Sequence, residues 1–243
     1  MKLVDLQVNG YMGVDFSSPQ LSESDFIQAC LKMTKYGVTA FLPTIITSSE
    51  KLYKRNLSII AMASDRSELK KHILGIHAEG PFISNKPGSV GAHNPKWTKK
   101  PNVEFLKKMQ DWAQGKIKIL TIAAELPNAA KLCEYACKNN ISVFLGHQDA
   151  QLHDLEKLAD AGAKAVTHLG NGMPNMVDRH DNILQYCLAC EKLSATIITD
   201  GHHLPAHLIK TIIKTKGIDK IAVISDASPI AGMRPGKYIV LGN

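Results

Sequence analysis

The sequence lacks the features that mark membrane and secreted proteins. No run among its 243 residues approaches the roughly 20 apolar residues needed to cross a bilayer. The start, Met1 to Asp5, has no apolar stretch of the kind found in signal peptides. The five cysteines are an odd number without an export signal, so a disulfide framework is not expected. We therefore expect a cytoplasmic protein with reduced thiols and no membrane partner.

Aromatic residues are also few, at 6% of the chain, and they are not interleaved with the basic residues. Lys and Arg number 29 against 22 Asp and Glu, a formal charge of +7, but the lysines lie in scattered pairs such as Lys70-Lys71 and Lys99-Lys100. Nucleic-acid-binding surfaces instead gather basic residues on one face and add aromatic ones. We therefore expect no nucleic-acid partner, although the charge suits an anionic small substrate.

The composition, with 44% hydrophobic and 21% charged residues, is that of a globular protein. A single core can grow to roughly 250 residues before chains tend to divide, so the length suits one large α/β domain or two small ones. No low-complexity linker interrupts the chain. We expect one α/β domain over residues 1–243.

Short β-branched runs alternate with longer segments of helical period, as in the βα units of a parallel sheet. The expected strands are Leu3 to Val8, Val38 to Pro43, Ile73 to His77, Ile117 to Ala123, Ile141 to Leu145, Ala165 to Thr167, Ala195 to Ile198 and Ile221 to Ile224. The expected helices are Ser24 to Lys35, Ser49 to Ser64, Asn102 to Gln114, Asn128 to Asn139, Leu152 to Ala161, Asn182 to Leu193 and Pro205 to Lys216. This alternation favours a TIM-type (β/α)8 barrel over an open doubly wound sheet.

In such barrels the reacting groups lie at the carboxyl ends of the strands. The polar residues at the expected strand ends are Gln7, Asn9, His77, Glu79, His147, His168, Asp200, His202, His203 and Asp226. A single His or Asp in such a place is more often a helix cap or a satisfied polar group, but several at one mouth favour a metal site. Glu79, His147 and His168 would supply the carboxylate and two imidazoles of a catalytic Zn²⁺ site. The ion would lower the pKa of a bound water, and Asp226 would act as its general base.

The cysteines offer a second place for zinc, which we consider less favoured. Cys187 and Cys190 have C-X-X-C spacing, and Cys133 and Cys137 are four residues apart, but both pairs fall in expected helices. No second C-X-X-C turn accompanies them, so buried thiols are the better interpretation.

Ordered motifs along the chain resemble those of one enzyme family. They are residues 5–10 (DLQVNG), 77–82 (HAEGPF), 91–95 (GAHNP), 146–147 (GH), 167–174 (THLGNGMP), 200–203 (DGHH) and 225–227 (SDA). In order and spacing they resemble the motifs of the N-acetylglucosamine-6-phosphate deacetylases of the amidohydrolase superfamily. The resemblance implies a metal-dependent barrel enzyme that releases acetate from N-acetyl-D-glucosamine 6-phosphate.

Carried over position by position, the resemblance implies a role for each matching residue. Glu79, His147 and His168 would bind the metal, and Asp226 would be the acid and base. The substrate-binding positions would be Ala92, His93, Asn171, Gly172, Arg179 and His203, with His93 also catalytic because it would polarise the acetamide carbonyl. Arg179 and His203 would bind the phosphate, and Arg179 would reach the site of a neighbouring subunit in a homodimer. Without the motif, Arg179 could equally be a surface residue in a charged turn.

Many amidohydrolases have His-X-His where this sequence has Gln7 and Asn9. Amide side chains are poor ligands for a borderline-soft ion, so the sequence resembles the branch with a single metal, most simply one Zn²⁺.

Family members extend further at both ends, so the barrel is expected to lack its last helix and the small flanking β domain. Gly172 stands where alanine is common, and the residues after Arg179 differ from the usual acidic residue, proline and glycine. Two alternatives stay open: an amidohydrolase for another N-acyl amino sugar phosphate or a cyclic amide, or an inactive remnant that binds metal or sugar phosphate.

Overall fold

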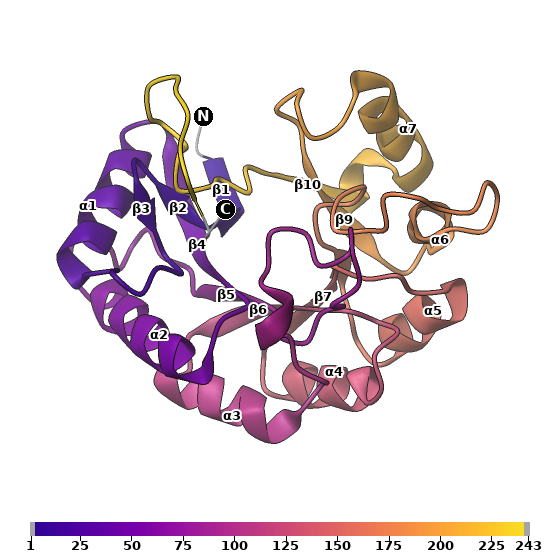
Figure 1. Cartoon of the computed structure of the whole chain (residues 1–243), viewed down its shortest axis with the longest axis horizontal. Coiled ribbons are helices and arrows are strands. Elements are labelled where there is room, and N and C mark those ends of the chain that lie inside the picture. Colours follow the sequence, from indigo (N-terminus) through magenta and orange to yellow (C-terminus); the bar gives the residue numbers. More distant parts are fainter. Residues whose placement is uncertain (1–2, 241–243) are drawn as a thin grey trace. The chain divides into compact units, whose positions relative to one another are not determined.

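The computed structural model describes residues 3–240. Its main sheet has eight strands that follow one another in chain order, β1-β4-β5-β6-β7-β8-β9-β10 (Figure 1). They are β1 (Leu3–Val8), β4 (Val38–Ile46), β5 (Ile76–Glu79), β6 (Ile117–Ile122), β7 (Ser142–Leu145), β8 (Ala165–Val166), β9 (Ser194–Ile198) and β10 (Ile221–Ile224). The α-helices are α1 (Glu23–Thr34), α2 (Glu50–Ser64), α3 (Val103–Trp112), α4 (Ala129–Lys138), α5 (Leu152–Asp160), α6 (Ile183–Ala189) and α7 (Ala206–Lys216). The expected TIM-type (β/α)8 fold class is thereby confirmed.

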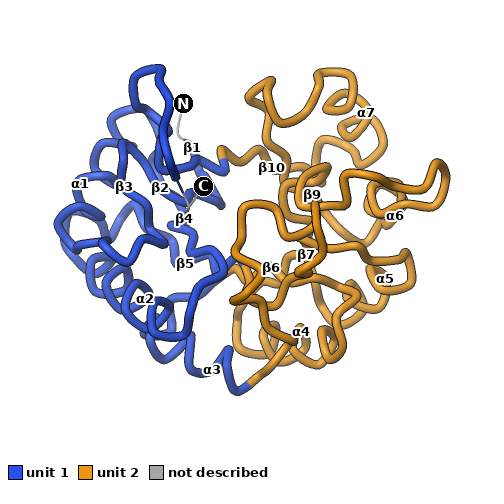
Figure 2. Tube along the Cα trace, in the orientation of Figure 1, with its two compact units in different colours: residues 1–79, 104–118, 226–243 blue, residues 80–103, 119–225 orange. Residues whose placement is uncertain are grey.

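By their internal contacts the residues fall into two compact units (Figure 2). The first comprises residues 1–79, 104–118 and 226–243, and the second residues 80–103 and 119–225. The expectation of a single domain over residues 1–243 stays a prediction.

In the first unit, β1, β4 and β5 pair in parallel. Buried aromatic side chains fill its core, and the rings of Phe16 and Phe26 meet edge to face with centroids 4.9 Å apart. At the start of α1 the Ser22 side chain accepts the Asp25 N–H, and at the start of α2 the Ser49 side chain accepts the Leu52 N–H. Both are N-cap serines. Expected and observed helices therefore agree closely here.

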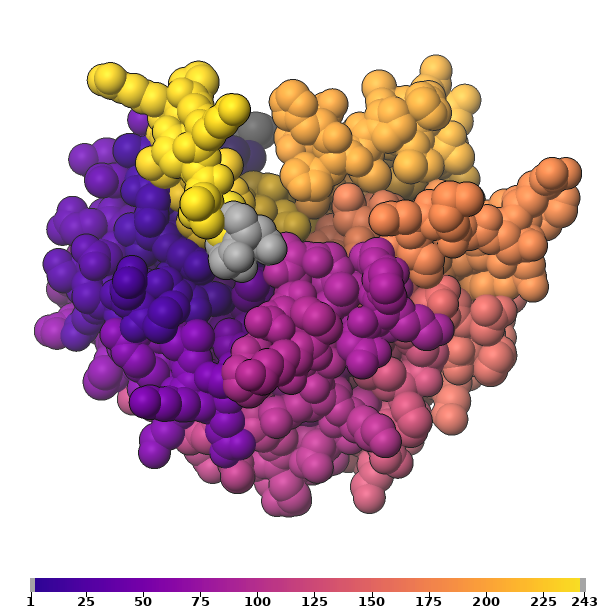
Figure 3. Space-filling model, viewed as in Figure 1, coloured from indigo at the N-terminus to yellow at the C-terminus, as the bar shows by residue number. Residues whose placement is uncertain are grey.

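A hairpin in the first unit was not expected. Strands β2 (Gly10–Tyr11) and β3 (Val14–Asp15) are joined by Met12 and Gly13, both with positive φ, as a type I′ turn requires. Methionine is an unusual residue for that conformation, so the sequence gives little indication of a hairpin here. The turn is held by residues 226–240: Met12 N–H donates to the Ala231 carbonyl and Gly13 N–H to that of Pro229. Figure 3 shows this C-terminal segment (yellow) against the N-terminal part of the chain (indigo).

In the second unit, β7, β8, β9 and β10 pair in parallel, and β7 pairs with β6. The inner residues are apolar, among them Leu120, Val143 and Ile197, which are all fully buried. Two short 3₁₀ turns, η1 (Pro95–Trp97) and η2 (Ile218–Lys220), complete the elements. After β10, residues 225–240 form no helix. No helix within residues 3–240 is long and apolar enough to cross a membrane.

Two boundaries differ from expectation for physical reasons. The strand expected over Ile73 to His77 begins later and runs to Glu79, because Gly75 has a φ of +150° and leaves only an isolated bridge between Ile73 and Phe41 before it. Helix α6 ends at Ala189, and buried Lys216 donates to the carbonyls of Cys187 and Cys190 at that end.

Candidate functional site

Three residues at strand ends form a group that could hold a metal ion. Glu79 ends β5, His147 follows β7 and His168 follows β8, and all three side chains are buried. One ligand atom from each lies within 4.8 Å of the others. This is the carboxylate and two-imidazole set that the strand-end residues predicted, and its chemistry suits a divalent first-row ion.

The His147 ring is fixed so that Nε2 can act as a ligand. Its Nδ1 lies 2.9 Å from the carbonyl oxygen of Ser89 and donates to it. The proton then sits on Nδ1, and Nε2 presents a lone pair. His147 therefore has the tautomer that a metal ligand needs.

Two more imidazoles in the second unit face His147. The Nε2 atoms of His93 and His168 each lie 3.1 Å from Nε2 of His147. The His93 and His168 rings meet the His147 ring edge to face, at 69° and 89°, with centroids 4.2 Å and 4.8 Å from that of His147. Ring nitrogens this close repel unless a proton or a cation lies between their lone pairs. The arrangement suits a cation between Nε2 of His147 and Nε2 of His168, because the single lone pair of each nitrogen can then be directed at the ion.

The backbone of the site residues is strained. His147, His168 and Asp226 have φ values of +52°, +31° and +48°, in the left-handed region that favours glycine. Such strain gathers at functional sites, where the surrounding hydrogen bonds outweigh it. Each of these residues comes two positions after the last residue of its strand, so the left-handed turn is what takes the chain out of the sheet.

Two glycines lie close to the His147 ring. A Cβ on Gly91 would lie 3.0 Å from Cε1 of His147, and one on Gly172 would lie 3.0 Å from Nδ1 of the same ring. Gly172 also approaches His168, whose Cε1 would be 3.1 Å from that Cβ. The glycine at position 172, where the family often has alanine, thus lets this loop lie directly against both imidazoles.

In the first unit, two amides bind the two candidate carboxylates. Gln7 Nε2 donates to Oε1 of buried Glu79 at 2.7 Å, and Asn9 Nδ2 donates to Oδ1 of Asp226 at 2.7 Å. Both oxygens must accept, which favours the ionised carboxylates. Gln7 and Asn9, expected only to be poor metal ligands, therefore also orient the acids.

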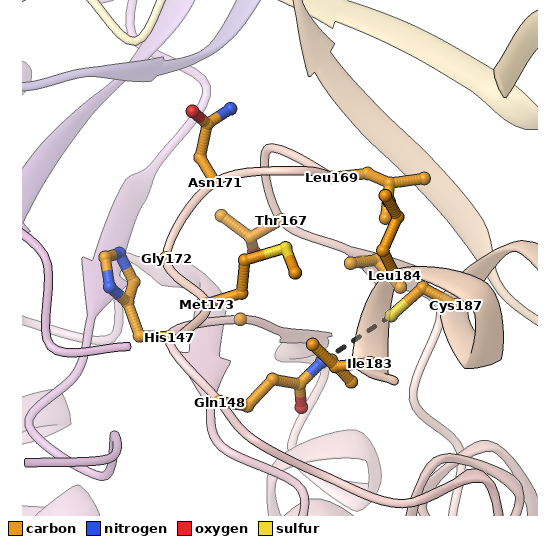
Figure 4. Close-up of a pocket in the computed structure, with 12 residues that line it drawn as sticks. His147, Gln148, Thr167, Leu169, Asn171, Gly172, Met173, Ile183, Leu184 and Cys187 are labelled. Atoms are coloured by element: carbon orange, nitrogen blue, oxygen red, sulfur yellow. Dashed lines mark hydrogen bonds between the residues drawn. The ribbon is translucent and has the colours of Figure 1, made fainter. Parts of the chain in front are cut away.

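A small pocket lies behind the loop that carries Asn171 and Gly172. Figure 4 shows His147 on one side of this loop and the apolar side chains of Leu169, Leu184 and Cys187 on the other. Gln148 supports the pocket wall, because its Oε1 accepts the Ala124 N–H at 3.1 Å and its Nε2 lies 4.0 Å from Sγ of Cys187.

The other expected substrate residues are more exposed. Ala92, Arg179 and His203 are exposed, and Asn171 is half-buried with its Nδ2 donating to the His168 carbonyl. His203 Nδ1 lies 2.8 Å from Oδ2 of Asp200. Hydrogen bonds from the N–H groups of residues 202 and 203 hold the pKa of the Asp200 carboxyl well below its usual value. The assignments of these residues to substrate stay predictions.

Sequence reasoning overlooked three supporting residues. Ser89 fixes the His147 tautomer, and Thr196 accepts the His168 N–H at 2.7 Å. Glu125, beyond β6, accepts the Asp149 N–H at 3.0 Å, and burial raises its pKa. A polar residue at the end of the fourth strand was a visible signal for Glu125, whereas Ser89 acts through its carbonyl and gives none.

The cysteines play no part in the candidate metal group. All five are free thiols, and only Cys137 is partly exposed. The group found within residues 3–240 contains two histidines and a glutamate and no cysteine. Buried thiols are therefore the interpretation that the structure supports.

Comparison with known proteins places these features in a family. No family model matches the chain. It is 31% identical over 239 residues to N-acetylglucosamine-6-phosphate deacetylase of Bacillus subtilis (strain 168), covering 97% of this chain and 59% of that protein. It is 28% identical over 240 residues to N-acetylgalactosamine-6-phosphate deacetylase of Escherichia coli O157:H7, covering 98% of this chain and 62% of that protein.

A solved structure agrees with the sequence comparison. A mutant N-acetyl-D-glucosamine-6-phosphate deacetylase from Mycobacterium smegmatis, in complex with N-acetyl-D-glucosamine-6-phosphate, matches with a TM-score of 0.88 and 25% identity. The match covers 99% of this chain and 61% of that chain, so this sequence spans less than two thirds of the length of these relatives. The chain is a homologue of the N-acetylglucosamine-6-phosphate deacetylases, as its motifs predicted.

Proposed function

We propose that this chain carries the active site of a metal-dependent hydrolase that converts N-acetyl-D-glucosamine 6-phosphate to glucosamine 6-phosphate and acetate. The observation that supports it best is the buried Glu79, His147 and His168 group in a homologue of these deacetylases. Both histidines stand on a left-handed backbone, a cost that a merely structural residue would not require.

One Zn²⁺ is the ion we propose for this group. The donor set of one carboxylate and two imidazoles suits zinc, and another first-row divalent ion could replace it. Gln7 is engaged with Glu79 and Asn9 with Asp226, which supports a single metal. When bound, the ion would act as a Lewis acid that lowers the pKa of water and polarises a carbonyl.

Asp226 is the proposed general base and acid. Asn9 donates to Oδ1 of Asp226, a hydrogen bond that orients the group and favours the carboxylate, the form that would take a proton from the attacking water. The same carboxyl would then protonate the departing amine. Its place after β10, at the carboxyl end of a barrel strand, is where such residues lie in this fold class.

The loops of the second unit would hold the acetylated sugar. His93, whose Nε2 is 3.1 Å from that of His147, would donate to the acetamide oxygen and stabilise the charge that develops there. Asn171 and the backbone of Ala92 and Gly172 would bind the sugar, since these loops lie beside the imidazoles.

Arg179 and His203 would bind the 6-phosphate. Both are exposed, and a guanidinium and an imidazole complement a dianion. We propose that Arg179 reaches the site of a second subunit in a homodimer. A phosphorylated sugar does not cross a bilayer unaided, which supports a cytoplasmic location.

The Escherichia coli relative supports a second substrate. That protein is an N-acetylgalactosamine-6-phosphate deacetylase at 28% identity, only slightly below the value for the Bacillus relative. The 4-epimer is therefore a candidate of the same chemical class.

Acetate release by the zinc-loaded protein tests these proposals. We expect release from N-acetylglucosamine 6-phosphate, weaker release from the unphosphorylated sugar, and a comparison with the galactosamine epimer decides the sugar. Asp226→Asn should bind zinc normally and lose release, whereas exposed Asp219→Asn should keep both. Turnover by Asp226→Asn would disprove its role, and a chain that binds zinc without releasing acetate would be an inactive remnant.

A further inference from the structure

The feature that carries a further inference is the junction between β8 and β9. Strand β8 has only two residues, and its last ladder partner is Val166 opposite Ala195. If the parallel ladder continued regularly, the next amide of this strand that faces β9 would donate to a backbone carbonyl of β9. The chain instead leaves the sheet at Thr167 and His168, where the His168 backbone turns to a φ of +31°.

Thr196, the next residue of β9, accepts the amides at this junction. The His168 N–H donates to the Thr196 hydroxyl oxygen at 2.7 Å, and the Leu169 N–H donates to the Thr196 carbonyl at 2.8 Å. The hydroxyl can itself donate to the Val166 carbonyl, 3.4 Å away. One residue thus holds the amides of His168 and its successor.

The hydroxyl is placed where an apolar residue would otherwise be expected. Thr196 is 2% exposed and is the buried polar residue of β9, whose other buried positions are Ala195, Ile197 and Ile198. Burying a hydroxyl is costly unless it is hydrogen-bonded, so the bond to His168 is what makes threonine tolerable there. Valine has nearly the same shape but would leave the His168 N–H without this acceptor.

The orientation of the His168 ring depends on that backbone. Its Nε2 lies 3.1 Å from that of His147, a separation that a small rotation of the left-handed turn would change. The turn is closed on its other side by the Asn171 N–H, which donates to the His168 carbonyl at 2.9 Å. The turn is therefore held on both sides, by Thr196 before His168 and by Asn171 after it.

We propose that Thr196 is a positioning residue of the metal site, acting through the backbone of His168. This rests on the proposed metal binding by His168. Mutation of a residue that hydrogen-bonds to a metal ligand, without touching the metal, typically changes the metal affinity of the site by roughly 10–100-fold. Thr196 would not touch the ion and would set only the direction in which Nε2 of His168 faces it.

The test compares zinc affinity, measured by competition with a chromophoric chelator, with the free energy of unfolding of the metal-free protein. Thr196→Val should bind zinc about 10-fold more weakly or worse, whereas Thr196→Ser, which keeps the hydroxyl, should bind as the wild type does. Gln110→Met is the control, because the Gln110 side chain accepts the Ile117 N–H at 3.0 Å and donates to the Ile117 carbonyl at 3.2 Å, at the amino end of β6 and so at the opposite end of the strand from the candidate site. It should lose stability and keep its zinc affinity.

The outcomes separate this inference from the proposed function. If the wild type binds no zinc, the proposed function is wrong and the inference fails with it. If the wild type binds zinc and Thr196→Val binds it equally well, the inference alone is wrong. Should Thr196→Val not fold, Thr196→Ser and Thr196→Ala differ by one oxygen atom, and equal affinity in that pair would likewise overturn the inference.

Discussion

Replacing Gly91 by alanine tests whether the loops fix the His147 ring. Gly91 has a φ of +56°, and an L residue in the left-handed region costs roughly 1–2 kcal/mol. The added Cβ would also lie 3.0 Å from Cε1 and 3.3 Å from Nδ1 of His147. The ring must yield by a few tenths of an ångström, but its Nδ1 is bonded to the Ser89 carbonyl. We therefore expect Gly91→Ala to lose both stability and zinc affinity.

Gly115→Ala is the matched control for this change. Gly115 has a φ of +77° and no atom within 4 Å of its potential Cβ, so alanine there carries the strain without the contact. Both variants should lose about 1–2 kcal/mol of unfolding free energy in denaturant titrations of the metal-free protein. Only Gly91→Ala should also bind zinc more weakly, by about tenfold, in a chelator competition. Equal zinc affinities in the two variants would refute the claim that the loop positions the ring.

Two further predictions concern buried groups of the second unit. Burial raises the pKa of Glu125, so the folded state holds its proton more tightly than the unfolded chain, and the free energy of unfolding should fall as pH rises from about 4.3 through the raised pKa. Glu125→Gln, which keeps an oxygen for the Asp149 N–H, should remove this component from a pH series of denaturant titrations; an unchanged slope would contradict it. Burial also raises the pKa of the Cys187 thiol to about 12, and Cys137 is the only partly exposed cysteine. Mass spectrometry of the native protein treated with iodoacetamide should show rapid modification of one cysteine, Cys137. If a chelator made further cysteines react rapidly, this would indicate that zinc is bound to them.

Much of the barrel could be predicted from the sequence because apolar periodicity is dictated by burial. The segment around residues 49–64 shows this, since Ser49 caps the helix that the period predicts and Ser64 ends it. The hairpin at Met12 could not be predicted, because its turn is imposed by hydrogen bonds to Pro229 and Ala231, more than 200 residues away along the chain. Local pattern carries no information about partners so distant in sequence.

The candidate ligands could be predicted for a geometric reason. In a parallel sheet the carboxyl ends of all strands lie at one edge, so the sequence places Glu79, His147 and His168 together. Their supports could not be predicted, because a threonine such as Thr196 is an ordinary strand residue whose hydroxyl gains meaning only from the neighbouring strand. Backbone angles such as the φ of +31° at His168 leave no trace in composition.

The left-handed backbone at His147, His168 and Asp226 also has an evolutionary consequence. Each side chain there costs about 1 kcal/mol relative to glycine, a sum that is a sizeable part of the net stability of a domain, about 5–15 kcal/mol. A chain released from the need to bind a metal would gain stability by accepting glycine at any of the three positions. Stability alone would thus favour glycine at these positions, and the side chains found there agree with the metal site and general base proposed above.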